Sequence, residues 1–267
     1  MRSTMIMTLG LTLGAATANG QAILYFSFGN DGTSNREMAV AYRNTTGAPA
    51  SLTLEVYDTT GRLLEVPYLA KDNGVARHSQ VNQELPAYGS GVLATNAGTT
   101  SYRKGWMRIV SRPAGAIAVT AHSRSRSSNG ALGHLFSLQP IPSRKVHSIG
   151  PFDNGSLDQY LIANNSSEAD QVTLIARTRT GEEMCRGRFK MQPASWYKVA
   201  LSDSLPCLAG KPGALEVRSD SGNVAAMLFL MTTGGDAIPV HPGASSEDTI
   251  TDVWSQLKKR AGFTWLQ

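Results

Sequence analysis

The chain has 267 residues, of which 41% are hydrophobic and 17% are charged, and its formal net charge is +5. This length predicts one large or two ordinary domains, and the hydrophobic fraction is that of a globular protein. The small positive charge comes with no recognised nucleic-acid motif and therefore argues against nucleic-acid binding.

The first 22 residues are predicted to be a signal peptide. Arg2 gives a positive start, the run from Met5 to Ala18 is uncharged, and small residues offer cleavage after Ala22 or after Ala18. The apolar run is about 14 residues, shorter than the roughly 20 that a membrane span needs. The alternative is a membrane anchor or a buried strand. No later stretch is long and apolar enough to span a membrane, so we expect a soluble mature chain that is periplasmic, surface-attached or extracellular.

One strand pattern occurs twice, at a fixed shift of 120 residues. Residues 44–61 read NTTGAPASLTLEVYDTTG, and residues 164–181 read NNSSEADQVTLIARTRTG. Each stretch has a polar turn, then alternating apolar residues, then a turn closed by glycine. Alternation with a period of two is typical of a half-buried strand, and its repetition indicates two copies of one β-domain. The sequence therefore predicts an all-β protein built from two tandem β-sandwich modules.

The first module is predicted to span residues 23–137. It contains a polar segment, Ala70–Gln83, that we expect to be irregular and absent from the second copy, because the shift falls from 120 to 107 between Pro86 and Pro193. Trp106 is expected to be buried between the two sheets, since an aromatic side chain at an inward position buries a large area. Residues 123–130 contain Arg124 and Arg126 and are predicted to form a basic, solvated hairpin turn.

Residues 138–148 are predicted to be an extended linker, because prolines 140 and 142 stiffen it, and to join two modules that fold independently. The second module is predicted to span residues 149–243. In the tail, residues 244–267, Ile250, Val253, Trp254 and Leu257 recur at helical spacing and predict a short amphipathic helix. This helix either packs back on a sandwich or docks on a partner or the envelope surface.

The chain resembles a group of uncharacterised secreted bacterial proteins built from tandem Ig-like β-sandwich modules. The similarity covers about residues 23–240 and is carried by PFDN at 151–154, LIANN at 161–165, VTL at 172–174, Gly181, LAG at 208–210 and Gly213, with Asn44, Thr53-Leu54, DTTG at 58–61 and Gly105-Trp106 in the first half. The resemblance implies two Ig-like antiparallel sandwiches in an exported protein. It provides no catalytic residue to transfer, and the predicted C-terminal helix lies outside it.

Cys185 and Cys207 are the only cysteines, and an even count in an exported chain favours a disulfide. A buried pair of free thiols, or a metal-binding or catalytic thiol, is the alternative. The histidines at 78, 122, 134, 147 and 241 show no zinc-site spacing. Asp153, Asn154 and Asp158 lie in one loop, where turn chemistry is favoured over a calcium site because the twelve-residue calcium pattern is missing.

No nucleophile elbow or phosphate-binding loop is present, so we expect a non-enzymatic envelope or extracellular protein, without cofactor or metal, that acts as a structural or adhesion-like interaction module. Its partner would be an envelope protein or a polysaccharide, and its oligomeric state is left open. One alternative is a carbohydrate- or cell-wall-binding protein that uses exposed aromatics such as Tyr88, Tyr102, Trp196 or Tyr197; a periplasmic chaperone-like protein is another. The candidate interaction residues are Lys71, Arg77, His78, Arg124, Arg126, Trp254 and Leu257.

Overall fold

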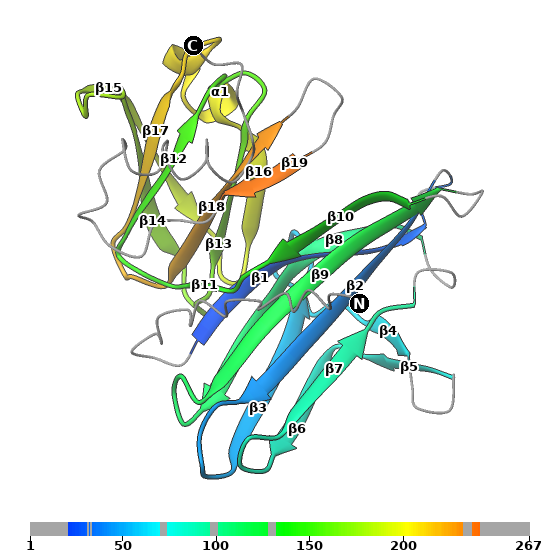
Figure 1. Ribbon diagram of the computed structural model, residues 1–267. Coiled ribbons are helices and arrows are strands. Elements are labelled where there is room, and N and C mark those ends of the chain that lie inside the picture. The colour runs from blue at the N-terminus through cyan, green and yellow to red at the C-terminus, as the bar shows by residue number, and fades with distance from the viewer. Residues whose placement is uncertain are drawn as a thin grey trace, which may run out of the picture.

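The computed structural model describes residues 21–30, 32, 34–69, 74–96, 101–127, 132–231 and 237–240, and this part of the chain is almost entirely antiparallel β-structure (Figure 1). The prediction of an all-β protein is confirmed. The short helical segments are α1 (Leu201–Ser204) and the 3-10 turn η2 (Pro206–Leu208). The strands are β1 (Gln21–Asn30), β2 (Ser34–Asn44), β3 (Ala50–Tyr57), β4 (Val66–Leu69), β5 (Val75–His78), β6 (Gln80–Leu85), β7 (Ser90–Ala94), β8 (Arg103–Arg112), β9 (Ile117–Ser127), β10 (Leu132–Leu138), β11 (Ile141–Pro142), β12 (Val146–Phe152), β13 (Gln159–Asn164), β14 (Asp170–Arg177), β15 (Glu183–Met191), β16 (Trp196–Ala200), β17 (Gly213–Ser219), β18 (Val224–Met231) and β19 (Ala237–Val240).

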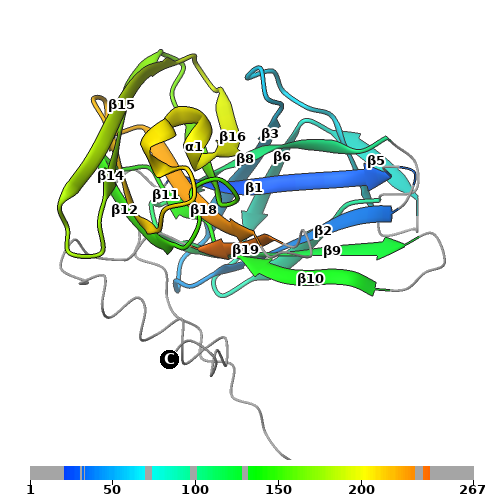
Figure 2. The same cartoon turned by 90° about the horizontal axis from the view of Figure 1, so that it is seen from above.

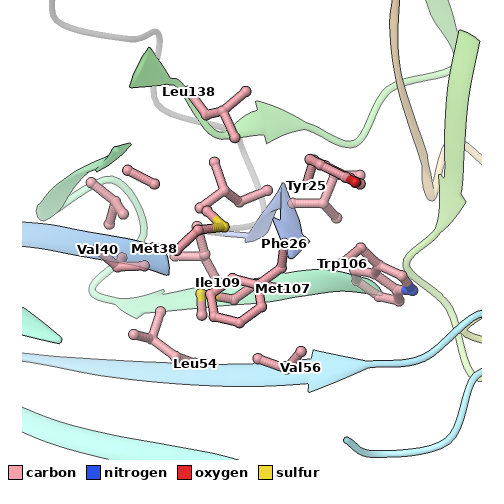
Figure 3. Close-up of a cluster of buried hydrophobic side chains, with 14 of the residues drawn as sticks. Tyr25, Phe26, Met38, Val40, Leu54, Val56, Trp106, Met107, Ile109 and Leu138 are labelled. Atoms are coloured by element: carbon pink, nitrogen blue, oxygen red, sulfur yellow. The ribbon is translucent and has the colours of Figure 1, made fainter. Parts of the chain in front are cut away.

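The N-terminal half, residues 21–142, forms a sheet that is folded into two leaves. One leaf has the order β11-β1-β8-β3-β6 and the other has the order β10-β9-β2-β7. The leaves are joined where β1 turns into β2, at the pairs Gly29–Arg36 and Asn30–Asn35. Because successive side chains of a strand point to opposite faces, alternate residues such as Met38, Leu54 and Met107 meet in the core between the leaves (Figure 3).

The C-terminal half, residues 143–240, repeats this strand order. One of its sheets is β12-β17-β14-β15, which matches β1-β8-β3-β6 strand for strand. The other is β16-β13-β18-β19, which matches β7-β2-β9-β10. A separate hydrophobic core, which includes Ile162, Leu174 and Val217, lies between these two sheets. The pattern repeated in the sequence, which covers β3 and β14 with their turns, is therefore one part of an eight-strand arrangement that both halves share.

Two equivalent asparagines hold the corresponding turns of the two halves. Asn44 and Asn164 are both fully buried, and each donates its Nδ2 group to the carbonyl four residues on, at 2.7 and 2.8 Å. Asn44 also donates to Pro86 O at 2.9 Å, and Asn164 donates to Gln192 O at 3.1 Å. The structural counterpart of Pro86 is therefore Gln192, one residue before the Pro193 that the sequence comparison had aligned with it.

Two segments predicted to be irregular contain strands. Between residues 70 and 83 lie β5 and the start of β6, so the expected irregular insertion is partly an ordered hairpin of β4 and β5. Arg124 and Arg126 lie within β9 and not in a turn. The reason is that β9 pairs with β2 over its full length, from Ser34–Ser127 to Asn44–Ile117, and this long ladder holds polar residues in the strand.

Aromatic side chains of β1, β16 and β18 join the two halves. Tyr25 packs edge-to-face against Trp196, with ring centroids 6.1 Å apart, and against Phe229, at 5.5 Å. Trp106 is fully buried, stacks on Tyr57 at 4.8 Å and donates its Nε1 group to the carbonyl of Ala194 at 3.0 Å. Trp106 was predicted to lie between the two sheets. It lies instead on the outer face, because its cross-strand partners Tyr25 and Tyr57 share that face.

The sheet β16-β13-β18-β19 is consequently covered on both faces. In β13 and β18, Ile162 and Leu228 point into the core of the C-terminal half, whereas Leu161, Met227 and Phe229 belong to the core cluster of the N-terminal half. Burial on both faces explains why these strands read as nearly continuous apolar runs and do not alternate. The two halves thus share a hydrophobic cluster.

Lys198 lies at the same junction. Its Nζ atom is 4.2 Å from the ring centroid of Phe229 and 5.0 Å from that of Tyr25. Burial, together with the positive charges of Lys104 and Arg36, lowers the pKa of Lys198 to about 8. The faces of the two aromatic rings attract the ammonium group.

The segment predicted to be a linker is held by both halves. Ile141 and Pro142 form β11 and pair with Ile23 and Ala22 of β1. Arg144 N donates to Val224 O at 2.9 Å. Gln21 and Ala22, the last residues of the predicted signal peptide, are also part of β1. The predicted C-terminal helix lies outside the described residues, and none of the helices described has the length and apolar character to cross a membrane.

Candidate interaction surface

A surface hollow of about 260 Å³ lies where the hairpin of β4 and β5 meets the outer face of the leaf β10-β9-β2-β7. The hairpin is attached there by a β-bridge between Tyr68 and Thr95 and by a hydrogen bond from Asn96 N to Pro67 O at 2.8 Å. The hollow is lined by Glu37, Met38, Ala39, Leu69, Ala94, Thr95, His122 and Arg124.

Small side chains create this space. Ala39 of β2 lies directly opposite Ala94 of β7 on one side and His122 of β9 on the other. Neither alanine fills the area between the strands, and Leu69, which is 50% exposed, stands at the rim. Thr95 also lines the hollow, and its hydroxyl oxygen accepts a hydrogen bond from Met38 N at 2.9 Å. The two alanines and Leu69 make the floor and part of the rim apolar.

Charged and polar groups line the rest of the hollow. Arg124 and Glu37 are cross-strand partners, and Arg124 Nε donates to Glu37 Oε2 at 2.5 Å. Both side chains are partly exposed, so this ion pair adds little to stability and can exchange its partners. His122 Nδ1 lies 2.9 Å from the hydroxyl of Ser137. A guanidinium, a carboxylate and an imidazole thus surround an apolar floor, an arrangement that suits a ligand with one polar and one apolar side.

The residues singled out from the sequence are only partly brought together. Arg124 lines the hollow, and Arg126 lies two residues further along β9 but does not line it. Arg77 and His78 are exposed on β5, in the attached hairpin, and do not line it either. Lys71, Trp254 and Leu257 lie outside the described residues.

Sequence reasoning missed Glu37, Leu69 and His122 as members of one site. Glu37 and Arg124 are 87 residues apart and meet only because of the register of β2 with β9. The one usable signal was the alternation along β9, which places His122, Arg124 and Arg126 on the same face. The position of the β4–β5 hairpin beside that face has no local signal in the sequence.

The loop considered for calcium is occupied by its own backbone. Asp158 Oδ2 accepts hydrogen bonds from the N–H groups of Asp153, at 2.9 Å, and Asn154, at 3.0 Å. Asp158 Oδ1 accepts a third from Met231 N at 2.9 Å. This is turn chemistry of the kind that aspartate favours. Across the described ranges, no three His, Cys, Asp or Glu side chains are grouped in a way that would hold a metal ion.

Cys185 and Cys207 are paired at disulfide distance, with their Cα atoms 6.5 Å apart. Cys185 is on β15, which forms one edge of its sheet, and Cys207 is in η2. The bond attaches the edge strand to the segment between β16 and β17. The pairing is the one expected from the sequence, and its role in this geometry is structural.

The aromatic candidates for carbohydrate binding are dispersed. Trp196 is buried at the junction, and Tyr102 carries the guanidinium of Arg36 over its ring at 5.2 Å. Tyr88 and Tyr197 are exposed but belong to different halves. A scan against models of known protein families and a search of curated proteins each returned no match. The function is therefore inferred from the geometry of the surface.

Proposed function

We propose that the chain is an exported, non-enzymatic protein of the envelope or the extracellular space, in which two Ig-like β-sandwich modules form one adhesion-like interaction unit. One observation carries the proposal. The outer face of β16-β13-β18-β19 is buried against the N-terminal half, whereas the described residues cover the matching face of β7-β2-β9-β10 only where the β4–β5 hairpin meets it, beside the hollow. The fold thus already uses this type of face for docking once, and a second copy of it faces solvent.

The Ig-like character of the modules is supported by the shared order of eight antiparallel strands in two facing sheets. Export is supported by the amino-terminal sequence and by the cysteine pair. If a signal peptase cleaves after Ala18, the pairs Gln21–Val110 and Ala22–Ile109 of β1 are kept, whereas cleavage after Ala22 removes them. We therefore propose Ala18 as the cleavage site.

The second candidate function is binding of carbohydrate or cell-wall polymer at the same hollow. Glu37, His122 and Arg124 provide hydrogen-bonding groups beside an apolar floor, and sugars present hydroxyl groups beside apolar C–H faces. This arrangement is also compatible with a short peptide segment of an envelope protein. The two ligand classes are separated by the experiment below.

The test is affinity capture with the secreted full-length chain. Immobilised protein is exposed separately to envelope proteins and to purified cell-wall polymer from the source cells. The double variant Leu69→Asp with Arg124→Glu changes the hollow. The matched control, Leu63→Asp with Arg62→Glu, makes the same chemical changes at exposed positions between β3 and β4. We expect the wild type and the control to retain a specific partner and the hollow variant to lose most of it.

Retention by all three proteins alike would contradict the assignment of the hollow. If no fraction is retained by the wild type, the binding function is rejected and a purely structural spacer is left. Retention from the protein fraction supports the interaction module, and retention from the polymer fraction alone supports the second candidate.

A further inference from the structure

The outer face of the sheet β12-β17-β14-β15 carries a regular array of cations. Arg186, Arg188 and Lys190 alternate along β15, so they share one face at intervals of about 6.6 Å. Thr173 of β14 is the cross-strand partner of both Arg188 and Arg218, so one row runs from Arg188 through Thr173 to Arg218. This sheet lies on the side of the C-terminal half away from the N-terminal half (Figures 1 and 2).

Positive charge is segregated onto this face. Residues 143–231 contain ten Lys and Arg and nine Asp and Glu. Five of these cations belong to the face, the fifth being Arg177, but only three of the acids do: Glu183, Glu216 and Asp220. The face therefore has a net charge of +2, whereas the rest of this segment has a net charge of −1.

Most of the cations are accessible to an external anion. Arg186 pairs with Glu183 at 2.6 Å, but its side chain is 63% exposed. Arg188 reaches Asp220 at 3.2 Å, and both side chains are exposed. Lys190 is exposed as well. Exposed ion pairs of this kind contribute little, so an incoming carboxylate or sulfate replaces the protein acid at small cost.

Glu216 fixes the remaining two cations. It accepts hydrogen bonds from Arg177, at 2.9 Å, and from Arg218, and it is mostly buried between them. Burial alone would raise the pKa of Glu216, but the hydrogen bonds from the two arginines outweigh it and lower the pKa. The two guanidinium groups are therefore held in place on the face, and Arg218 stays exposed.

Charged side chains on an edge strand also prevent sheets from pairing edge to edge. That role accounts for Arg186, Arg188 and Lys190 on β15. It does not account for Arg177 on β14 and Arg218 on β17, since both of these strands are interior. The array extends across the face and not only along its edge.

We propose that this face binds an acidic polysaccharide, a polymer whose carboxylate or sulfate groups recur along an extended chain. The evenly spaced cations match a repeating anion, and Thr173 places a hydroxyl between two of them. Single-stranded nucleic acids are bound with the help of aromatic side chains that stack on the bases. The alternate residues that make up this face in the four strands include none. The face is separate from the hollow, and the inference does not depend on the binding proposed there.

The test measures the affinity of the full chain for a linear polyuronate, for dextran sulfate and for single-stranded DNA at several salt concentrations. The variant Arg186→Gln, Arg188→Gln, Lys190→Gln removes three cations of the face. The control Arg62→Gln, Arg103→Gln, Arg112→Gln removes three exposed cations of the N-terminal half and changes the net charge equally. A third protein, Arg186→Lys with Arg188→Lys, keeps the charge.

We expect the face variant to bind at least one of the acidic polysaccharides about tenfold more weakly, with a shallower salt dependence, and the other two proteins to bind as the wild type does. An unchanged thermal unfolding midpoint shows that the face variant is folded. Wild-type binding by Arg186→Lys with Arg188→Lys shows that positive charge at these positions, and not the arginine side chain itself, is what the ligand requires. Absence of wild-type binding to both polysaccharides, or equal weakening by the control, would overturn the proposal. Equally tight binding of DNA would overturn the assigned ligand class.

Discussion

Several buried polar side chains of this protein are fixed by specific partners. The carboxylate of Asp170, for example, accepts hydrogen bonds from the hydroxyls of Ser219, at 2.5 Å, and Ser221, at 2.7 Å. His147 is satisfied on one side only. Its Nε2 atom lies 2.8 Å from Val224 O, while its buried Nδ1 atom has no hydrogen-bond partner among the described residues. A proton added to Nδ1 therefore goes unpaired in the protein interior.

This geometry predicts a pH-dependent stability. Burial, opposed by the hydrogen bond to Val224 and assisted by the positive charge of Arg144, lowers the pKa of His147 to about 4. Between an unfolded pKa of 6.5 and the folded value, the unfolded chain binds a proton that the folded chain does not. The contribution of His147 to the free energy of unfolding is therefore fully present above pH 6.5. It is lost as the pH falls towards 4, and its size is about 3 kcal/mol.

Urea unfolding between pH 7.5 and pH 4.5 measures this effect. In His147→Gln, whose amide can still donate to Val224 O, we expect this part of the pH dependence to be lost. The control His122→Gln removes an exposed imidazole and should keep it. If the free energy of unfolding of His147→Gln depends on pH as that of the wild type does, His147 is not the source of the effect.

Individual strands were the most predictable level of this structure. Leu52, Leu54 and Val56 were expected to point inwards from their alternation, and all three are buried. What the sequence did not predict depends on contacts between distant segments. Met227 and Phe229 face the other half, so β18 shows no alternation of apolar and polar residues. Glu37 meets Arg124 only because of the register in which β2 pairs with β9. Such tertiary contacts override local patterns.

The disulfide acts at the level of elements, because it ties the edge strand β15 to η2 across a separation of 22 residues. In the chain-entropy description, closing such a loop restricts the unfolded chain and stabilises the fold by about 3 kcal/mol. We expect the double variant Cys185→Ser, Cys207→Ser to lose about that much free energy of unfolding in urea. Thiol titration of the denatured wild type without reductant should find no free thiol, and two reactive thiols would show that the bond does not form.

At the scale of the whole molecule, the sequence indicated two independently folding modules, but the halves share a hydrophobic cluster centred on Tyr25. We therefore expect one coupled unfolding transition. Removing a buried aromatic ring costs about 3 kcal/mol or more, so Tyr25→Ala should weaken the joint and split the transition into two.

Calorimetry of the wild type, Tyr25→Ala and Tyr88→Ala tests this coupling. Tyr88 is 61% exposed, so its replacement should leave a single transition at nearly the same temperature. Two transitions in the wild type would show that the halves are not coupled, and a single transition in Tyr25→Ala would show that Tyr25 is not what couples them.

The joint between the halves is heterologous: one face of the N-terminal half meets a different face of the C-terminal half. A contact of this type does not close on itself, and if it recurred from molecule to molecule it would build a fibre. Among the described residues, the two faces that are not part of the joint lack the side chains that the joint requires. Thr120 and His122 take the positions of Met227 and Phe229 on one of them. On the other, Arg177 and Ala214 replace Tyr57 and Trp106. The two remaining faces therefore act like the capping repeats of a repeat protein, because neither can form the joint with another molecule. The same two faces are the ones proposed above to bind other partners.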